Sequence, residues 1–418
     1  MLSQPGKRIK VILLTHSIYC FVEHFLIQYN VLFAQALGAS GTDIGLISLI
    51  GALVLFLTSP YIGRAVERRS MKKIMLLGLI CDMVAALFFI VANDWRLLIP
   101  AFALLFILFR QIAFADMIFV TFTPPTMRAT LMGLSRVLWN IMVFLASPTA
   151  ALIVTYFGGI NEQGIRPLYY ISLIILFAIF LILYKELDDF YISDNREESK
   201  QNYSLFEDYQ RLFKTESHLK YWLLIRLFRG GSMILMRVFA PLWIVNIKGA
   251  TAIVLGTLSA LSTICGLLIQ VPVGKLADKL GRKKIFILLS TFHCIGLIIL
   301  ILAPTHEWLM LASILGIGVG GLEGGGVGGA ANAPLMVMWW EAVPSASRGR
   351  LYGLEGMIMS TARLFTMIGG ILWDLDLKVL VILIPLLTEI LVVIPFVCKL
   401  PDNPKKIINF KSNFNLNY

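Results

Sequence analysis

A series of long apolar stretches, recurring from one end of the chain to the other, constrains its fold more than any other feature. Each stretch holds about twenty residues, enough at a helical rise of roughly 1.5 Å per residue to cross a hydrocarbon layer about 30 Å thick. Hydrophobic residues make up 58% of the 418 residues and charged residues only 15%, against about a quarter charged in water-soluble domains. The sequence therefore predicts an all-α integral membrane protein that crosses the bilayer many times.

The apolar runs predict twelve transmembrane helices, six in each half of the chain. We expect them at 11–37, 44–63, 73–92, 96–119, 131–157, 167–185, 221–247, 252–274, 284–304, 308–340, 350–374 and 378–399. The tenth run is too long for one straight span, and Pro334 is expected to mark an end or a break in it. The predicted domains are six-helix bundles over 1–187 and 221–400, a charged cytoplasmic linker over 188–220 and a cytoplasmic tail over 401–418.

A basic segment is repeated in the two halves. The segment 274–284 reads GKLADKLGRKK and the segment 63–73 reads GRAVERRSMKK, at an offset of 274 minus 63, or 211 residues. The same offset relates Gly45 to Gly256, in the helix that precedes each segment. Recurrence of a segment together with its helix indicates an internal structural duplication.

The later copy resembles the signature loop between the second and third helices of the major facilitator superfamily, written G-x-L-A-D-x-x-G-R-K/R-x. The earlier copy departs from that pattern at Glu67, Ser70 and Met71. The resemblance implies the facilitator fold, in which twelve transmembrane helices form two pseudo-symmetric six-helix bundles. The residues that match in the later copy are Gly274, Leu276, Ala277, Asp278, Gly281, Arg282 and Lys283.

The resemblance implies that this loop acts as a latch, which holds the cytoplasmic side of the two bundles closed. The resemblance implies that Asp278 acts on the helix that begins near Leu131, and Glu67 on the helix that begins near Leu351. A carboxylate can accept hydrogen bonds from the exposed N–H groups that start a helix. The expected cytoplasmic gate consists of Gly63, Glu67, Lys72, Gly274, Asp278, Gly281, Arg282 and Lys283, with Arg128 and Arg348 in the similar loops before the fifth and eleventh helices.

The distribution of Lys and Arg predicts the orientation in the membrane. Most Lys and Arg residues fall in the loops that lie on the inner side if the N-terminus is inside. Cytoplasmic loops of membrane proteins carry an excess of positive charge, so this distribution favours that orientation. We therefore expect a multi-pass protein of the cell membrane with both termini in the cytoplasm, and the net charge of +11 gives no reason to expect nucleic acid as a partner. The outer loops hold only Arg96, Arg166, Lys248 and Lys378.

Charged side chains inside the predicted spans are the candidates for function. An arginine facing lipid at mid-membrane costs about 2.5–3.5 kcal/mol on insertion scales. Arg136 and Arg226 lie near the inner ends of their helices and are expected to reach the cytoplasmic surface. For Arg229, the sequence leaves open whether the side chain reaches that surface or faces the interior. The deeper residues, which are the candidates for a substrate or proton site, are Glu23, His24, Arg110, Arg237, Glu323 and Arg363.

In the family that the chain resembles, helices 1, 4, 7 and 10 line a central cavity, which would gather five of these residues around one water-filled site. A structural ion pair, such as Glu23 with Arg237, is the alternative, since buried charges pair wherever they can. Polar residues along two adjoining stripes of the first helix also favour a polar lining. Asp82 and His293, related by the same offset of 211 residues, are expected to be structural.

These observations predict a secondary active transporter that moves a small organic solute by alternating access. The arginines favour an anionic or polar solute, because guanidinium binds carboxylate and phosphate through two parallel hydrogen bonds. Glu23 or Glu323 could also bind and release a proton during the transport cycle, so coupling to H+ is an open alternative. The alternatives are a multidrug efflux carrier and a non-transporting receptor or sensor on the same fold. The sequence has no catalytic or phosphate-binding motif, so we do not expect an enzyme, a cofactor or a metal site. The protein is expected to be a monomer.

Overall fold

The computed structural model describes residues 4–107, 118, 128–190, 219–317, 325–342 and 348–400. The predicted site residues Arg110 and Glu323 lie outside the described residues, as do most of the predicted linker and the whole predicted tail. For some helical residues only the backbone is described, among them Gly63, Glu67, Arg128, Arg136 and Arg348.

The first half of the described chain consists of helices joined by short turns. It forms α1 (Gln4–Ala36), α2 (Gly41–Arg68), α3 (Met71–Val91), η1 (Trp95–Leu97), α4 (Leu98–Ile107), α6 (Arg128–Tyr156) and α7 (Glu162–Glu186).

The second half has the same character, with several helices divided into shorter pieces. It forms α9 (Leu219–Leu242), η3 (Trp243–Ile247), α10 (Ala252–Leu280), α11 (Arg282–Leu302), α12 (His306–Leu315), α13 (Gly326–Gly329), α14 (Asn332–Glu341), α15 (Arg348–Ala362), α16 (Leu364–Asp374), α17 (Lys378–Thr388), η5 (Glu389–Val393) and α18 (Ile394–Lys399). Among the described residues there are no strands, and 10 helices are long and apolar enough to cross a membrane. Each of the twelve predicted runs contains helix, and the predicted all-α membrane fold is confirmed.

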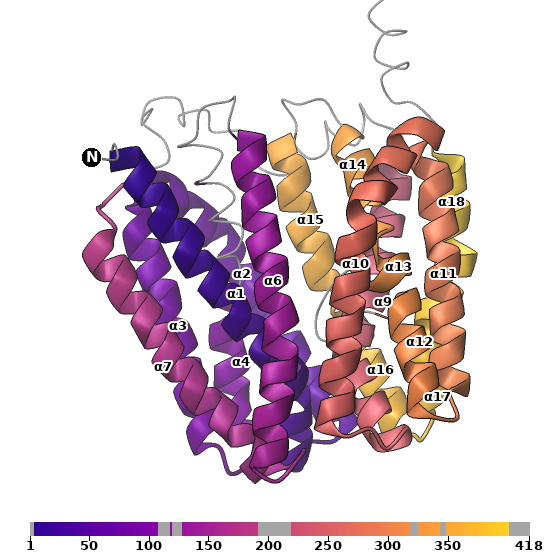
Figure 1. Ribbon diagram of the computed structural model, residues 1–418, viewed down its shortest axis with the longest axis horizontal. Coiled ribbons are helices and arrows are strands. Elements are labelled where there is room, and N and C mark those ends of the chain that lie inside the picture. The colour runs from indigo at the N-terminus through magenta and orange to yellow at the C-terminus, as the bar shows by residue number, and fades with distance from the viewer. Residues whose placement is uncertain are drawn as a thin grey trace, which may run out of the picture.

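Two groups of helices stand side by side in Figure 1. The indigo to magenta helices of the first half form one group, and the salmon to yellow helices of the second half form the other. Within the first half α1 packs on α6 and α7, and within the second half α9 packs on α15 and α17. Within the described part of the chain, the halves meet mainly through four helix pairs, α2 with α16, α6 with α10, α1 with α9 and α2 with α15.

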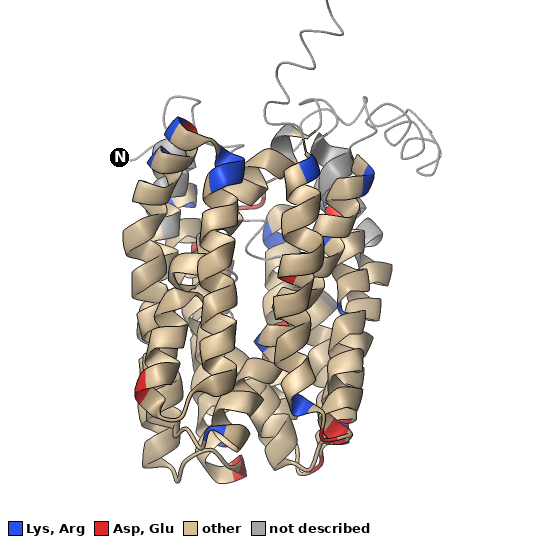
Figure 2. Cartoon of the chain, turned by 90° about the vertical axis from the view of Figure 1, so that its right-hand side faces the viewer, with Lys and Arg blue, Asp and Glu red and all other residues tan. Residues whose placement is uncertain are grey.

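The outer surface of the helices is apolar. Large side chains such as those of Leu57, Leu152, Ile174 and Leu268 are exposed rather than packed. A water-soluble monomer rarely exposes apolar side chains over so much of its surface, whereas a lipid-facing surface must be apolar. Figure 2 shows the charged residues gathered mainly near the two ends of the bundle, with few between. The end that carries the N-terminus and the two repeated basic segments is called the basic end below.

The tenth apolar run is broken by glycines. Gly316 follows α12 with φ of 134°, and Gly326 starts α13 with φ of 67°, both in the region that favours glycine. A Cβ on Gly328 would lie 2.5 Å from the backbone nitrogen of His293 in α11, so glycine also permits a close approach of α13 to α11. Pro334, which is predicted to mark an end or a break, lies in the first turn of α14, just after the gap between α13 and α14, where its missing N–H costs little.

The repeated basic segment is predicted as a loop, but the structure shows it to be largely helical. α10 continues through most of 274–284, and only Gly281, with φ of 98°, separates α10 from α11. In the first half, α2 likewise continues through most of the earlier copy before α3 begins. Lys, Leu and Ala are good helix formers, so the chain turns only where the sequence supplies a glycine or a serine.

Candidate functional site

Two of the predicted site residues meet across the boundary between the halves. Glu23 of α1 and Arg237 of α9 form an ion pair, with Nη2 of the arginine 3.7 Å from Oε1 of the glutamate. The side chains are 20% and 21% exposed, and the second carboxylate oxygen of Glu23 has no hydrogen-bond partner in the described part of the chain. The pair is therefore partly exposed, and it links the halves near the middle of α1 and in the last two turns of α9.

His24, the next residue of α1, faces the first half. Its Nδ1 lies 2.9 Å from the carbonyl oxygen of Cys20, and its ring lies edge-on to Trp139 of α6 at 6.1 Å between centroids. One turn further, Gln28 is also buried, and neither amide atom has a hydrogen-bond partner among the described residues. The polar stripe of α1 that contains these two residues ends at Gln35, whose side-chain oxygen accepts a hydrogen bond from the other half.

Arg363 provides a second contact between the halves. It lies at the junction of α15 and α16, and its guanidinium carbon is 4.2 Å from the centroid of the Phe106 ring in α4. An arginine over an aromatic face gains about 0.5–2 kcal/mol, depending on its desolvation. The structure therefore describes three of the charged candidates, Glu23, Arg237 and Arg363, in contacts that cross from one half to the other.

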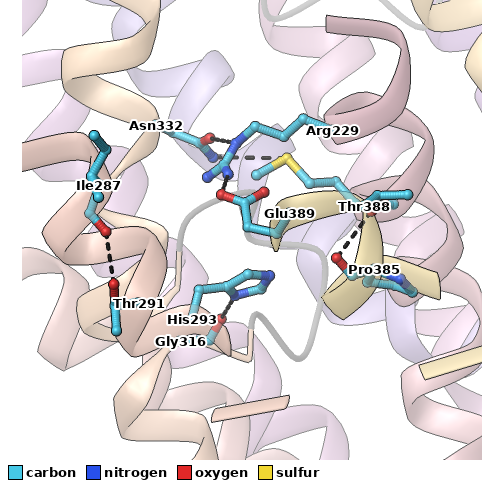
Figure 3. A network of polar contacts seen from close by, with 11 residues as sticks. Arg229, Ile287, Thr291, His293, Gly316, Asn332, Pro385, Thr388 and Glu389 are labelled. Carbon is cyan, nitrogen blue, oxygen red and sulfur yellow. Dashed lines mark hydrogen bonds and ion pairs between the residues drawn. The ribbon is translucent and has the colours of Figure 1, made fainter. Parts of the chain in front are cut away.

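A second ion pair lies wholly inside the second half (Figure 3). Arg229 of α9 donates to Glu389 of η5, and the two side chains are 4% and 3% exposed. The Arg229 Nε also donates to Oδ1 of Asn332 at 3.3 Å, and its guanidinium lies 5.1 Å from the Phe286 ring centroid. Arg229, whose placement the sequence left open, is thus paired within its own half rather than at the surface.

Glu389 is a functional candidate that the sequence analysis did not select. It is a lone acid in an apolar run, and it begins a π-helical turn, a rare geometry that often occurs at functional sites. In Figure 3 His293 lies below it, with Nδ1 2.8 Å from the carbonyl oxygen of Gly316 at the end of α12. The buried network therefore connects α9, α11, η5 and the broken tenth helix.

Arg226 corrects an expectation from the sequence. It is predicted to reach the cytoplasmic surface, but it pairs with Glu355 of α15, and its side chain is only 13% exposed. The same carboxylate accepts a hydrogen bond from Nε1 of Trp339 at 2.9 Å. A packed partner is available within hydrogen-bonding distance, so the side chain does not have to extend to water.

Asp82, which is predicted to be structural, accepts a hydrogen bond from the Tyr19 hydroxyl of α1 at 3.1 Å. This contact lies within the first half, and the structural role of Asp82 stays a prediction. Among the residues that the structure describes, no cluster of three or more His, Cys, Asp or Glu residues could hold a metal ion.

At the basic end, described side chains of the gate motif contact their own half. Asp278 pairs with Arg282 at 3.7 Å, and its side chain is 72% exposed. Lys283 donates to the carbonyl oxygens of Cys398 and Leu400 at 2.6 and 2.9 Å, beside the end of the last helix. The equivalent Lys72 donates to the carbonyl oxygen of Tyr184 at 2.9 Å, near the end of α7, so the duplication extends to these contacts.

At the opposite end, the two halves are joined by hydrogen bonds. The backbone N–H groups of Gly41 and Thr42, at the start of α2, donate to the Asp374 carboxylate at the end of α16, both at 2.7 Å. The Asn246 amide donates to Gln35 at 2.9 Å. These bonds hold α2 to α16 and α1 to the end of α9.

Small residues allow close packing at that same end. A Cβ on Gly45 would lie 2.8 Å from the carbonyl oxygen of Thr366, so α2 and α16 could not approach as they do with a larger residue there. Between α6 and α10, the Ser147 hydroxyl donates to the Ser259 hydroxyl at 3.1 Å. Helix contacts within a membrane depend on such small residues and short polar contacts.

The profile of the family described as Major Facilitator Superfamily matches residues 12–367 and 222–415 of the chain. A mutant of the nucleoside transporter NupG has a TM-score of 0.74 at 12% identity, over 94% of this chain and 100% of the other. A bacterial homologue of the human lysosomal transporter Spinster, inward-facing and unoccupied, has a TM-score of 0.64 at 15% identity, over 96% of each chain. A bacterial homologue of the iron transporter ferroportin, inward-facing, has a TM-score of 0.67 at 16% identity, over 95% and 99%. No curated protein sequence matches the chain.

Proposed function

The chain belongs to the major facilitator superfamily, and on this premise we propose that it is a secondary active transporter that moves a small organic solute across the cell membrane by alternating access. In this mechanism two pseudo-symmetric bundles rock around a site near the bilayer midplane. The proposed site contains Glu23, Arg237 and Arg363, with Arg110 and Glu323 as further members by their places in the sequence.

One observation supports the proposal most strongly. The described polar contacts join the two halves at one end of the bundle, whereas at the basic end they lie within each half. From the Glu23–Arg237 pair toward the end opposite the basic segments, the halves are joined by the Gln35–Asn246, Ser147–Ser259 and Asp374–Gly41 hydrogen bonds. At the basic end, the contacts that the structure describes for Lys72, Lys283 and Asp278 lie within their own halves. This asymmetry is expected of one state of a rocking carrier, closed at the outer side.

If the basic end is cytoplasmic, as the positive-inside rule predicts, this state faces inward. Two of the similar solved structures are described as inward-facing, which supports the proposal. The latch predicted for Asp278 would then belong to the opposite state, in which the basic end closes. Its partnership with Arg282 is what the latch residue would adopt while the latch is open.

The charges at the site favour a solute with at least one negative group. The described candidates comprise two guanidinium groups and one carboxylate. A guanidinium binds a carboxylate or phosphate through two parallel hydrogen bonds. Exchange of a proton at Glu23 or Glu323 would couple the movement to a pH gradient.

Flux measurements on the purified protein in liposomes test the proposed function. Saturable uptake or efflux of a solute is expected, and its dependence on an imposed pH gradient tests coupling to H+. Saturable binding without flux of any solute would instead favour a receptor on the same fold.

A disulfide across the closed end tests the mechanism. We predict that Ser147→Cys with Ser259→Cys, in a background without the five native cysteines, forms a bond on oxidation, because the native hydroxyl oxygens are only 3.1 Å apart. Oxidation should abolish flux and reduction should restore it, while each single variant keeps flux under both conditions. Undiminished flux with the disulfide formed would rule out separation of α6 from α10 as a step of transport.

A further inference from the structure

We propose that the basic end of the molecule binds anionic phospholipids at two places related by the internal repeat, one at Lys73 in α3 and one at Lys284 in α11. At each place the lysine binds the phosphate of a negatively charged headgroup, and the acyl chains lie along the apolar face of the same helix. Both places are on the outer surface of the bundle, so their occupation does not depend on which solute is carried.

α3 and α11 each present one exposed stripe along their length. In α3 the exposed apolar residues are three or four positions apart, as on one face of a helix, and they are Leu77, Ile80, Val84, Leu87 and Val91. In α11 the corresponding exposed residues are Leu288, Thr291, Ile295, Ile298 and Leu302. The two sets are related by the same offset, since 288 minus 77 and 302 minus 91 both give 211. The duplication therefore extends to the outer surface of the helices.

Both stripes face lipid rather than the boundary between the halves. α3 packs mainly on α7 and α4, and α11 mainly on α12, α13 and α10, in each case within its own half. In Figure 1 the two helices lie on opposite sides of the bundle. The stripes stay exposed toward the end where the halves are joined, with Val91 58% and Leu302 71% exposed. An apolar face that is exposed along a whole transmembrane helix contacts acyl chains.

A lysine is the first member of each stripe. Lys73 and Lys284 are exposed, and each lies in the first turn of its helix, four residues before the first apolar member of the stripe. From Lys73 to Val91 is 91 minus 73, or 18 residues, which is about 27 Å of helix. The hydrocarbon layer is about 30 Å thick. When the apolar part of the stripe lies in hydrocarbon, the ammonium group therefore reaches the headgroup layer of one leaflet.

The two consecutive lysines of each repeat point in different directions. Lys72 donates to the carbonyl oxygen of Tyr184 and Lys283 to that of Leu400, both at 2.9 Å, so these two lysines turn toward the protein. The next residue is rotated by about 100° around the helix axis, which places Lys73 and Lys284 on the lipid-facing stripe. A lysine in the headgroup layer attracts anionic lipids. The charge at the two places is therefore complementary to an anionic phospholipid.

Further positive charge lies beside the second place. The exposed face of α10 contains Leu268 and Val271, and it continues at the same helical spacing into Lys275 and Lys279, which are both exposed. Asp278, an exposed carboxylate in the same turn, pairs with an arginine of α11. In the earlier copy of the repeat, the positions 211 residues before these two lysines are also basic, namely Arg64 and Arg68. Both copies of the repeat thus carry basic residues in addition to the lysine of the stripe.

Lipid binding to the purified protein in detergent tests the two places. The probes are phosphatidylglycerol and phosphatidylcholine with identical acyl chains, and bound molecules are counted by native mass spectrometry during a titration. We expect two molecules of phosphatidylglycerol to bind about fivefold or more tightly than phosphatidylcholine, because only the first has a net negative charge. Inorganic phosphate should not displace them, since it has no acyl chains to lie along the stripe.

Substitutions of the two lysines assign the bound lipids to the stripes. Lys73→Gln and Lys284→Gln should each lower the affinity for one phosphatidylglycerol molecule by about fivefold, the effect of one lysine near the membrane surface. Lys73→Arg and Lys284→Arg keep the charge and should keep the affinity. The matched control is Lys7→Gln, which removes an exposed lysine at the same end that already pairs with Glu186 at 2.8 Å. It should leave the preference for phosphatidylglycerol unchanged, and melting temperatures check that every variant is folded.

Three results would overturn the proposal. Equal affinity of the wild type for the two lipids would show that headgroup charge is not recognised. An unchanged preference in both glutamine variants, or an equal loss in Lys7→Gln, would show that these positions do not bind the lipid. Displacement of phosphatidylglycerol by inorganic phosphate would assign the lysines to a soluble anion instead. Loss at Lys73→Gln and Lys284→Gln alone, with both arginine variants like the wild type, would confirm the two lipid sites.

Discussion

At the residue scale, the Arg229–Glu389 ion pair is almost fully buried, and its effect on folding stability has two parts. Both charges are removed from water, and their attraction roughly offsets that cost, so the pair as a whole adds little net stability. The two partners are nevertheless strongly dependent on each other, because neither finds water if the other is removed. The pair therefore matters to the fold through the penalty for breaking it.

We predict that Glu389→Gln lowers the free energy of unfolding by about 3–5 kcal/mol, since it leaves the Arg229 guanidinium buried without a counter-charge. The double variant Arg229→Met with Glu389→Met should recover most of that loss, because both charges are then replaced by apolar groups. Thermal denaturation of the purified protein in detergent provides the comparison. A single variant that melts like the wild type would show that water reaches the pair.

At the scale of single elements, Asp374 connects the end of α16 to the start of α2. The first N–H groups of a helix have no partner within it, and the partial positive charge at that end favours a carboxylate. The two bonds of 2.7 Å to Gly41 and Thr42 therefore cap α2 from the other half of the molecule. In the proposed mechanism, the cap can persist only while this end of the molecule is closed.

We predict that Asp374→Asn shifts the protein away from the state closed at that end, by about fivefold for the loss of about 1 kcal/mol of capping. The shift is measured as faster reaction of a membrane-impermeant maleimide with a cysteine introduced at Ser147. The matched control is Asp376→Asn, two residues away. Lys378 donates a hydrogen bond to Asp376 and lowers the pKa of its carboxyl, so that variant also removes a charge, but one outside the interface. Equal labelling rates in the two variants would contradict the cap.

The broken tenth helix shows how local sequence and packing combine within one element. Its length and its glycines predict that the run is not one straight helix, and the positive φ values at Gly316 and Gly326 are the local reason. The approach of Gly328 to the backbone of His293 depends instead on α11, a separate helix. The break was therefore predictable from the run itself, but its neighbour was not.

At the scale of the whole molecule, the exposed pair between Asp278 and Arg282 has little to do with stability. Ion pairs between exposed side chains contribute about 0–1 kcal/mol, and Asp278 is the more exposed partner. A larger role for Asp278 would have to come from another state of the molecule, in which the basic ends of the two bundles approach. That state is the one in which the family resemblance implies a latch.

We predict that Asp278→Asn reduces the transport rate by about tenfold, as expected if roughly 1.4 kcal/mol of latch contact is lost, while the folded yield is unchanged. Glu162→Gln is the matched control, because it also removes an exposed carboxylate that pairs with an arginine four residues later. Flux into liposomes and yield after size-exclusion chromatography are the two measurements. Wild-type flux in Asp278→Asn would remove the latch from the mechanism.

The parts of the fold that were predictable follow from short stretches of sequence. Hydropathy predicted the twelve apolar runs, and the repeat of 63–73 at 274–284 predicted two related halves. The predicted facilitator fold is confirmed by the family match and by the similar structures. The roles of the gate and site residues stay predictions, and those at Arg110 and Glu323 fall outside the described residues.

The sequence alone determined that the chain is a duplicated bundle of membrane helices, because burying an apolar run in lipid is a local free-energy gain that hardly depends on its neighbours. Only the tertiary structure decided which charges meet. Glu23 could have faced Arg237 or another cation, and nothing in the sequence assigned Glu389 to Arg229 or Asp374 to α2. Such pairings depend on the rotation of each helix and on which helices pack together, and both are set by the packing of the whole molecule.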